Sequence, residues 1–205
     1  MNKQDIKLIH DFLPNHSIND ILQFAKIDFI KNEIIATDTK KLLIFKMNEN
    51  DFKDCSGIVY VHKKVMKLIF SLMKKDTDYM FYQNAIVANN VKIDLNTKPE
   101  TIDKDYPLLD FVKTIDADLP KQLTTKDIRN IEYDLAKQNA YFNADHLRPV
   151  QEYIAGSYAV RFKEQKEKDP ATVKIDIYIE YEEEAVLRHT AIIQGIIYRP
   201  IKTLF

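Results

Sequence analysis

The stretch TVKIDIYIEY, residues 172–181, alternates apolar and polar side chains along its whole length, and this period constrains the fold more than any other feature of the chain. Successive side chains of a β-strand point to opposite faces, so the pattern predicts one long strand with its apolar face on a core. The side chains expected to point inward are Val173, Ile175, Ile177, Ile179 and Tyr181, and those expected to point outward are Lys174, Asp176, Tyr178 and Glu180.

Helical spacing is equally clear in KKVMKLIFSLMKK, residues 63–75. We expect a helix there whose core-facing side chains are Val65, Met66, Ile69, Leu72 and Met73. Capping residues and apolar spacing predict further helices over 17–26, 124–139 and 143–156. Shorter strands are expected at 33–37, 42–45, 58–61, 78–83, 89–95, 141–142, 157–163 and 190–200. This mixture predicts an α+β fold.

A polar corner separates the first two of these strands. Ala36, Thr37 and Asp38 end one strand, and the chain returns at Leu42. Aspartate and threonine side chains readily hydrogen-bond to nearby backbone groups in turns. Turn chemistry accounts for Asp38, so we expect a corner residue rather than a catalytic one.

The strand–helix–strand pattern occurs twice. With an offset of 81 residues, the apolar positions Met66, Ile69 and Met73 fall on Leu147, Val150 and Ile154, respectively. A repeat of this length indicates duplicated modules, because solenoid repeats are shorter and more numerous. Pro107 ends the first unit, so we expect two domains, at residues 1–108 and 109–205.

Composition narrows the class of protein. Apolar residues make up 45% of the chain and charged residues 30%, which is typical of a globular protein. Cys55 is the one cysteine, so no internal disulfide forms, and the polar start MNKQDIKLIHDF lacks the apolar core of a signal peptide. No run of apolar residues is long enough to cross a bilayer. We expect a soluble cytoplasmic protein.

The order of these motifs resembles a known family. A strand ending in ATD, then GIVYV, a basic helix, further strands and YP at 106–107 resembles one domain of the bacterial DNA polymerase III beta subunit, the sliding clamp. AYFNADHLRPVQEYIAGSYAVRF is similar to the last half-domain of that family, and IIYRPI to its terminal strand. The resemblance implies clamp-like antiparallel sheets with paired helices. It also implies a processivity factor that encircles duplex DNA without sequence preference.

The chain departs from the family in size. The family has three domains of similar size, whereas this chain has room for two at most, and residues 109–139 carry only one clear helix. A shortened or phage-type clamp, with three chains to a ring, fits this length. The partners implied by the resemblance are duplex DNA, a DNA polymerase or other replication proteins, and further copies of the chain.

Basic residues on the helices are the candidates for DNA contact that the resemblance implies. Lysine and arginine bind phosphates without reading bases, which suits a sliding contact. The candidate residues are Lys64, Lys67, Lys74, Lys75, Lys126, Arg129 and Arg148. The alternative is an ordinary solvated helix face. The formal net charge of −1 excludes binding through overall charge, although a local basic face remains compatible with it.

The C-terminal strand is the second implied site. In the family it borders an apolar groove for short peptides of partner proteins, which here would be edged by Ile197, Arg199, Pro200 and Ile201. Arg199 replaces a usually apolar residue, so the groove is altered. The alternative is a plain edge strand.

Catalysis has little support in the sequence. Glu180 to Glu184, with Asp176 upstream, could hold a divalent cation as in a carboxylate-dependent nuclease. The histidines lack zinc-ligand spacing, and no glycine-rich phosphate loop is present. We therefore expect no enzyme activity, no metal and no cofactor. A clamp-derived module that binds proteins but no DNA is the main alternative function.

Overall fold

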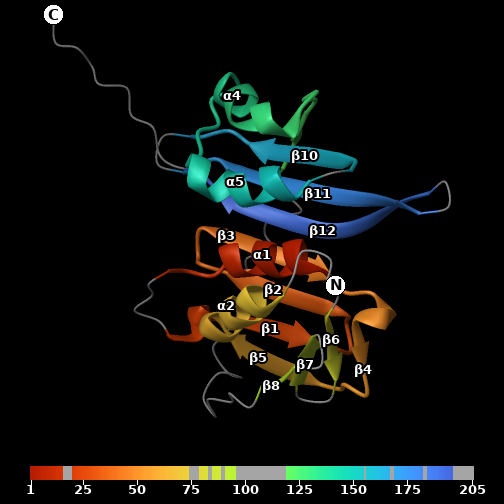
Figure 1. Cartoon of the computed structure of the whole chain (residues 1–205). Coiled ribbons are helices and arrows are strands. Elements are labelled where there is room, and N and C mark those ends of the chain that lie inside the picture. The colour runs from red at the N-terminus through yellow and green to blue at the C-terminus, as the bar shows by residue number, and fades with distance from the viewer. Residues whose placement is uncertain are drawn as a thin grey trace, which may run out of the picture.

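The computed structural model describes residues 1–15, 20–73, 79–82, 85–88, 91–95, 119–154, 156–166, 169–181 and 184–195. Its larger sheet has eight antiparallel strands in the order β5-β1-β2-β3-β12-β11-β10-β9 (Figure 1). Their bounds are β1 Phe24–Asp28, β2 Glu33–Thr37, β3 Lys41–Lys46, β5 Ile58–His62, β9 Lys121–Leu123, β10 Tyr158–Lys163, β11 Thr172–Tyr181 and β12 Glu184–Gln194.

A smaller sheet follows the order β4-β6-β7-β8. Its strands are β4 Phe52–Lys53, β6 Tyr79–Tyr82, β7 Ala85–Ala88 and β8 Val91–Asp94. The ring of Phe29, which follows β1, packs against Phe52 and Phe81 with centroid distances of 5.5 and 5.7 Å. These aromatic contacts join the smaller sheet to the larger one.

The larger sheet joins the two halves of the chain, which we define as residues 1–95 (the first half) and 119–195 (the second half). Strand β3 of the first half pairs with β12 of the second, in a register that runs from Phe45 opposite His189 to Lys41 opposite Ile193. We call this pairing, together with the helix contact above it, the junction. Because β3 pairs with β2 on its other side, the sheet continues through the junction without a break.

Helices cover one face of the larger sheet, which we call the helix face. Figure 1 shows α1 (Lys3–Asp11), α2 (Lys63–Leu72) and α5 (Ala144–Tyr153) in front of the strands. Helix α4 (Ile131–Ala136) lies at the top of the view, above α5. Helix α1 packs against α2 on one side and against α5 on the other. The contact between α1 and α5 is therefore the helical part of the junction.

The repeat expected from the sequence is present in the helices. Helices α2 and α5 begin and end at positions that differ by 81 residues. Their N-caps keep the same offset: His62 Nδ1 accepts a hydrogen bond from the Lys64 amide at 3.0 Å, and Asn143 Oδ1 accepts one from the Asp145 amide at 3.0 Å. Equivalent sequence thus folds into equivalent helices, while the expected domain boundary at 108 lies outside the described residues.

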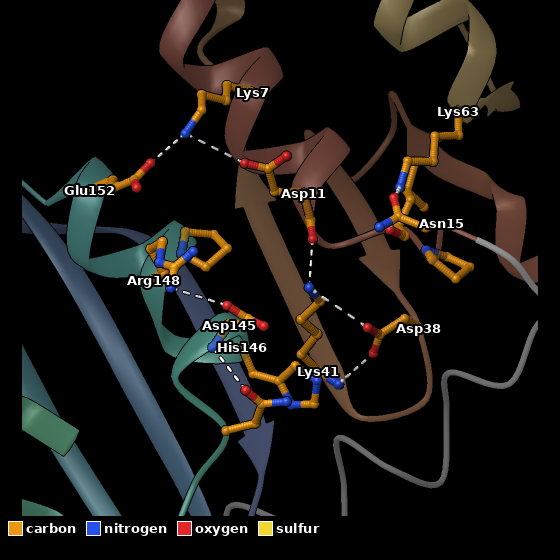
Figure 2. Close-up of a pocket in the computed structure, with 14 residues that line it drawn as sticks. Lys7, Asp11, Asn15, Asp38, Lys41, Lys63, Asp145, His146, Arg148 and Glu152 are labelled. Carbon is orange, nitrogen blue, oxygen red and sulfur yellow. Dashed lines mark hydrogen bonds and ion pairs between the residues drawn. The ribbon is translucent and has the colours of Figure 1, made fainter.

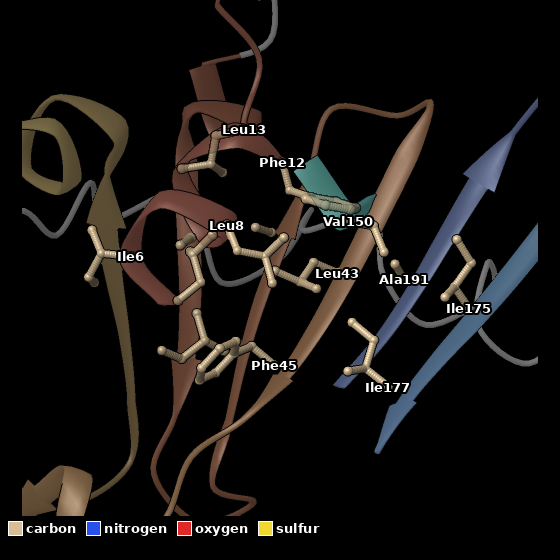
Figure 3. Packing of buried hydrophobic residues seen from close by; sticks show 14 of the residues in the cluster. Ile6, Leu8, Phe12, Leu13, Leu43, Phe45, Val150, Ile175, Ile177 and Ala191 are labelled. Atoms are coloured by element: carbon tan, nitrogen blue, oxygen red, sulfur yellow. The ribbon is translucent and has the colours of Figure 1, made fainter. Parts of the chain in front are cut away.

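One apolar core extends through both halves. Figure 3 shows Leu8, Phe12, Leu43 and Phe45 of the first half packed toward residues of the second. The second half contributes Val150, Ile175, Ile177 and Ala191. All of these side chains are 2% exposed or less. The two halves therefore share one cluster of buried apolar side chains.

The N-terminal region differs from the sequence-based expectation. The helix predicted over 17–26 is wrong in its described part, because residues 20–23 form a 3₁₀ turn and Phe24–Asp28 form β1. Pairing of β1 with β2 and β5 on both sides satisfies its backbone, which outweighs the local helical pattern. The helix is instead α1, which begins with a reciprocal capping box between Asn2 and Asp5.

Several other elements also differ. Leu72 was expected in the core but is 45% exposed, because α2 ends there, whereas Met66, Ile69 and Met73 are buried as expected. Tyr141 and Phe142 form no strand, and the helix predicted over 124–139 is a 3₁₀ turn followed by the short α4. Strand β7 was not predicted separately, although Ile86 and Val87 at its centre have strong strand character.

Strand β11 is confirmed over residues 172–181, but the prediction for its outward face is wrong in part. Lys174 and Asp176 are only 9% and 5% exposed. Thr190 Oγ1 donates a hydrogen bond to Asp176 at 2.7 Å, and the Arg161 guanidinium lies 3.5 Å from the same carboxylate. Paired charges and hydrogen bonds allow these polar groups to be buried on the second face.

In the described part of the chain, no helix combines the length and the apolar character that crossing a membrane requires.

Candidate nucleic-acid interface

The described lysine candidates of α2, Lys64 and Lys67, lie on the side of the helix opposite its buried side chains. Lys64 and Lys67 are exposed, and no carboxylate of the described residues forms an ion pair with either. The same surface also exposes Leu68 and Leu72 by 48% and 45%. The outer side of α2 is thus a mixed surface of free ammonium groups and apolar side chains.

Of the other described candidates for DNA contact, Lys126 is available, whereas the two arginines are paired with carboxylates. Lys126 is exposed just before the 3₁₀ turn at Ile128–Asn130. The Arg129 guanidinium lies 2.7 Å from the Asp127 carboxylate, and that of Arg148 lies 3.1 Å from Asp145. Exposed pairs of this kind contribute little stability, but each carboxylate offsets the field of its arginine. Of the described candidates, Lys64, Lys67 and Lys126 therefore remain the strongest.

Six predicted site residues lie outside the described residues. They are Lys74, Lys75, Ile197, Arg199, Pro200 and Ile201. Their roles therefore stay predictions.

A polar pocket of about 470 Å³ opens at the junction (Figure 2). It lies between the C-terminal end of α1, the N-terminal end of α5, the corner between β2 and β3, and Lys63 at the start of α2. Its cationic lining residues are Lys7, Lys41, Lys63 and Arg148, and its carboxylates are Asp11, Asp38, Asp145 and Glu152. Equal numbers of the two signs leave the pocket polar but without a net attraction for either sign.

Asp38 is a corner residue, as predicted. Its Oδ1 accepts hydrogen bonds from the amides of Lys40 and Lys41, both at 2.9 Å, and its own amide donates to the Lys41 carbonyl. Thr37 Oγ1 donates to the same carbonyl at 2.9 Å. Thr39 has a φ of 76°, in the left-handed region that tight corners often require. The corner thereby holds the Asp38 carboxylate at the rim of the pocket.

Two lysines that the sequence analysis did not single out hold the C-terminal end of α1. Figure 2 shows Lys41 between Asp11 and Asp38; its Nζ donates to the Asp11 carbonyl at 2.6 Å. Lys63 Nζ donates to the Leu13 carbonyl at 2.7 Å. Burial, and then the nearby Lys41 charge, lower the pKa of Lys63. Cations stabilise the carbonyl end of a helix, so both lysines stabilise this end of α1.

An ion pair crosses the mouth of the pocket. Lys7 of α1 pairs with Glu152 of α5 and lies 3.6 Å from Asp11. The hydrogen bond to Glu152 raises the pKa of Lys7. A second, smaller cavity of about 200 Å³ continues along the furrow between α1 and α5, and its lining includes Tyr153. No sequence spacing could indicate this furrow, because Lys7 and Glu152 are far apart in the chain.

The end of β12 lies beside the Asp38 corner. The Gln194 amide donates to the Lys40 carbonyl at 2.7 Å, and the Gly195 amide to the Ala171 carbonyl at 2.7 Å. A Cβ at position 195 would meet the Tyr141 carbonyl oxygen at 2.5 Å, so the close approach of these backbones requires glycine. The residues predicted to edge the peptide groove follow directly from this point of the sequence.

The described residues contain no cluster of histidine, cysteine and carboxylate side chains that could hold a metal ion. Asp176, one member of the acidic group that the sequence suggested, is engaged by Thr190, Arg161 and Lys174. Cys55 is partly exposed, and its thiol donates to the Lys53 carbonyl at 3.4 Å.

Comparison with known proteins completes the description of the fold. No family model and no curated protein matches the sequence. Among solved structures, the DNA polymerase sliding clamp of Bacillus subtilis superposes with a TM-score of 0.64 at 10% identity, over 96% of this chain and 62% of that one. The beta chain of DNA polymerase III from Streptococcus pneumoniae gives a TM-score of 0.60 at 11% identity, over 97% and 64%. The chain has the fold of a bacterial sliding clamp.

This clamp fold confirms the resemblance drawn from the sequence, including the antiparallel sheets and the helices that cover them. The chain spans less than two thirds of the length of these clamps. A third structure, the Helicobacter pylori beta clamp bound to a DNA ligase peptide, gives a TM-score of 0.57 at 12% identity, over 96% of this chain and 63% of that one. At such identities the likeness establishes the fold and leaves the activity to be argued from this chain's residues.

Proposed function

We propose that this chain is a shortened sliding clamp, a processivity factor that contacts duplex DNA without sequence preference and tethers partner proteins. The clamp fold together with the free ammonium groups of Lys64 and Lys67 on the helix face carries the proposal. Flexible lysine side chains neutralise phosphate charge at any sequence, and they release condensed counterions when they do so. Such contacts let a protein move along DNA while it stays bound.

The mechanism we propose is topological and involves no catalysed step. Retention on DNA would come from a closed assembly of several copies, because one chain is shorter than a clamp subunit. The strands at the ends of the sheets supply surfaces for that assembly, since edge strands present unpaired backbone groups. In this proposal the helix face lines the DNA path, and the opposite face of the larger sheet is turned away from it.

The proposal is tested with the double variant Lys64→Glu/Lys67→Glu. If α2 faces the duplex, affinity should fall equally for unrelated DNA sequences. The logarithmic dependence on salt should become shallower by about 0.9 for each lost phosphate contact. The variant should keep its fold, because neither side chain is buried. Fluorescence anisotropy of two labelled duplexes over a range of salt concentrations measures both effects.

The matched control is Lys31→Glu/Lys53→Glu, which reverses the same number of exposed charges elsewhere. Lys31 lies in the turn after Asp28, whereas α2 begins after His62, at the other end of the paired strands β1 and β5. Loss of affinity in the control alone, or an unchanged salt slope in the α2 variant, would place the DNA contact on another surface.

A clamp-derived module that binds proteins but no DNA is the second candidate. The exposed Leu68 and Leu72 beside the α2 lysines favour it, because apolar side chains on an outer helix face are typical of protein contacts. If both DNA sequences fail to bind even at low salt, this function replaces the first. A magnesium-dependent cleavage assay would separately detect the nuclease activity considered from the acidic group near Asp176.

A further inference from the structure

A chain of polar side chains crosses the junction inside the apolar core. The Lys46 amide of β3 donates to His189 Nδ1 of β12 at 3.2 Å, and His189 Nε2 lies 2.9 Å from the Tyr153 hydroxyl of α5. That hydroxyl donates to Asp5 Oδ1 of α1 at 2.9 Å. His189 is 1% exposed and Asp5 is 5% exposed. The chain therefore starts in the first half, passes through two residues of the second, and returns to the first.

The direction of every hydrogen bond in this chain is determined. A backbone amide can only donate, so His189 Nδ1 accepts and the imidazole proton is assigned to Nε2. His189 then donates to the Tyr153 oxygen, and Tyr153 donates to the Asp5 carboxylate. The other Asp5 oxygen accepts from the Asn2 amide at 2.6 Å. The direction of each hydrogen bond is therefore fixed, and no member of the chain lacks a partner.

Electrostatics and packing keep His189 neutral in this arrangement. Burial lowers the pKa of His189 to about 3, and burial raises the pKa of Asp5 and of Tyr153. The imidazole stacks on Phe45 with a centroid distance of 3.9 Å and an interplanar angle of 16°. A protonated Nδ1 would face the Lys46 amide donor to donor, so the chain forms only with neutral imidazole.

The apolar core would hold the halves together without this chain. Hydrophobic contact is non-directional, so residues such as Leu43 and Ala191 favour contact between the halves but tolerate small changes of angle. Hydrogen bonds are directional, and a satisfied buried network disfavours geometries that would leave its members unpaired. A buried His–Tyr–Asp chain adds little net stability over apolar side chains of similar size.

We propose that the Asp5–Tyr153–His189 chain is a conformational lock that sets the angle between the two halves. The lock connects α1 to α5 and β3 to β12, which are the two contacts that make up the junction. Removing it leaves the halves associated through the core, the β3–β12 ladder and the Lys7–Glu152 ion pair, but the angle at which α1 and α5 pack is then less restricted. In an assembly of several copies, this angle determines the curvature that each chain contributes.

The experiment measures a distance between the two halves, which changes when their angle changes. Spin labels at Lys67→Cys on α2 and Glu132→Cys on α4, in a Cys55→Ser background, report the distance between the halves by pulsed electron resonance. Both label sites are exposed. Tyr153→Phe removes one hydroxyl from the lock and keeps the ring. The expected result is a broadened or displaced distance distribution. The melting temperature should fall as well, because buried His189 Nε2 and Asp5 Oδ1 lose their hydrogen-bond partner.

The matched control is Tyr158→Phe, which also removes one hydroxyl. Tyr158 donates to the Thr125 carbonyl at 3.2 Å, within the second half, so its loss should leave the distance distribution unchanged. Equal distributions in the parent and Tyr153→Phe would overturn the lock. Equal broadening in both tyrosine variants would also overturn it, because the effect would then be unspecific.

A second pair of variants tests the histidine. His189→Gln keeps an N–H donor for Tyr153, whereas His189→Leu keeps only volume. The lock predicts that the glutamine variant retains a narrower distribution than the leucine variant, and identical distributions would contradict it. The measurement uses no DNA, so it stands or falls independently of the proposed function.

Discussion

At the scale of single residues, the polar side chains at the junction connect the elements of the fold, whereas the candidate DNA-binding residues are exposed on its surface. Asp38 and Lys41 fix the corner, and Asp5, Tyr153 and His189 connect α1, α5 and β12. The contacts of Asp5, Tyr153 and His189 could not be predicted from sequence spacing, because these residues come from distant parts of the chain. The corner role of Asp38 was predictable, since its hydrogen bonds reach only the next few amides.

The buried imidazole predicts a specific acid sensitivity. The folded-state pKa of His189 is lowered to about 3 from an ordinary value of 6.5, so between these values the unfolded chain binds the proton and the folded chain does not. Stability from this residue is therefore complete above pH 6.5 and falls as pH is lowered, by about 2 kcal/mol at pH 5. Asp5 acts in the opposite direction, because its folded-state pKa is raised.

The measurement compares urea unfolding at pH 7 and pH 5 for the parent, His189→Gln and the control Tyr158→Phe. The free energy of unfolding of His189→Gln should change less between the two values than that of the parent. Burial raises the pKa of Tyr158, so its hydroxyl stays protonated at both pH values and Tyr158→Phe should keep the parent's dependence. Parallel behaviour of all three proteins would show that His189 is protonated as easily in the folded state as in the unfolded chain.

At the scale of elements, the sequence predicted those helices and strands whose conformation depends mainly on neighbouring residues. Helices α2 and α5 were predicted because their buried side chains recur at helical spacing, with a candidate N-cap before α5. Strand β1 was missed because pairing with β2 and β5 decides its conformation. Helix α1 had a readable signal in Asn2 and Asp5, the two ends of its capping box.

The end of β12 leads to a prediction about partner proteins. Gln194 is bonded to Lys40 at the corner, so we propose that the following residues edge a groove for short peptides. Arg199 there should favour ligands with an acidic residue, because a partly buried guanidinium requires a carboxylate or carbonyl partner. Deleting residues 199–205 should abolish peptide capture, and Arg199→Met should shift preference toward apolar peptides. Titration of fluorescent peptides with and without an acidic position measures both; equal binding to the parent and both variants would move the site elsewhere.

At the scale of the whole molecule, the clamp fold could be predicted from the order of the motifs, although no single motif carries it. The joining of β3 to β12 could not, because a pairing across almost 150 residues leaves no local trace in the sequence. The apolar alternation of β11 indicated one buried face, and only the folded structure shows that Lys174 and Asp176 are buried on the other.

The last prediction concerns the number of copies of the chain that assemble in solution. A chain that spans less than two thirds of a clamp subunit cannot encircle DNA alone, and soluble homo-oligomers are mostly closed and symmetric. We therefore expect a closed ring of about three copies of the 24.1 kDa chain, with two domains from each chain. Light scattering over a range of concentrations measures the mass. Lys64→Glu/Lys67→Glu should keep the same mass, because α2 lies on the helix face rather than at a sheet edge. A monomer whose mass is constant up to tens of micromolar would contradict the ring and leave the protein-binding module as the function of this fold.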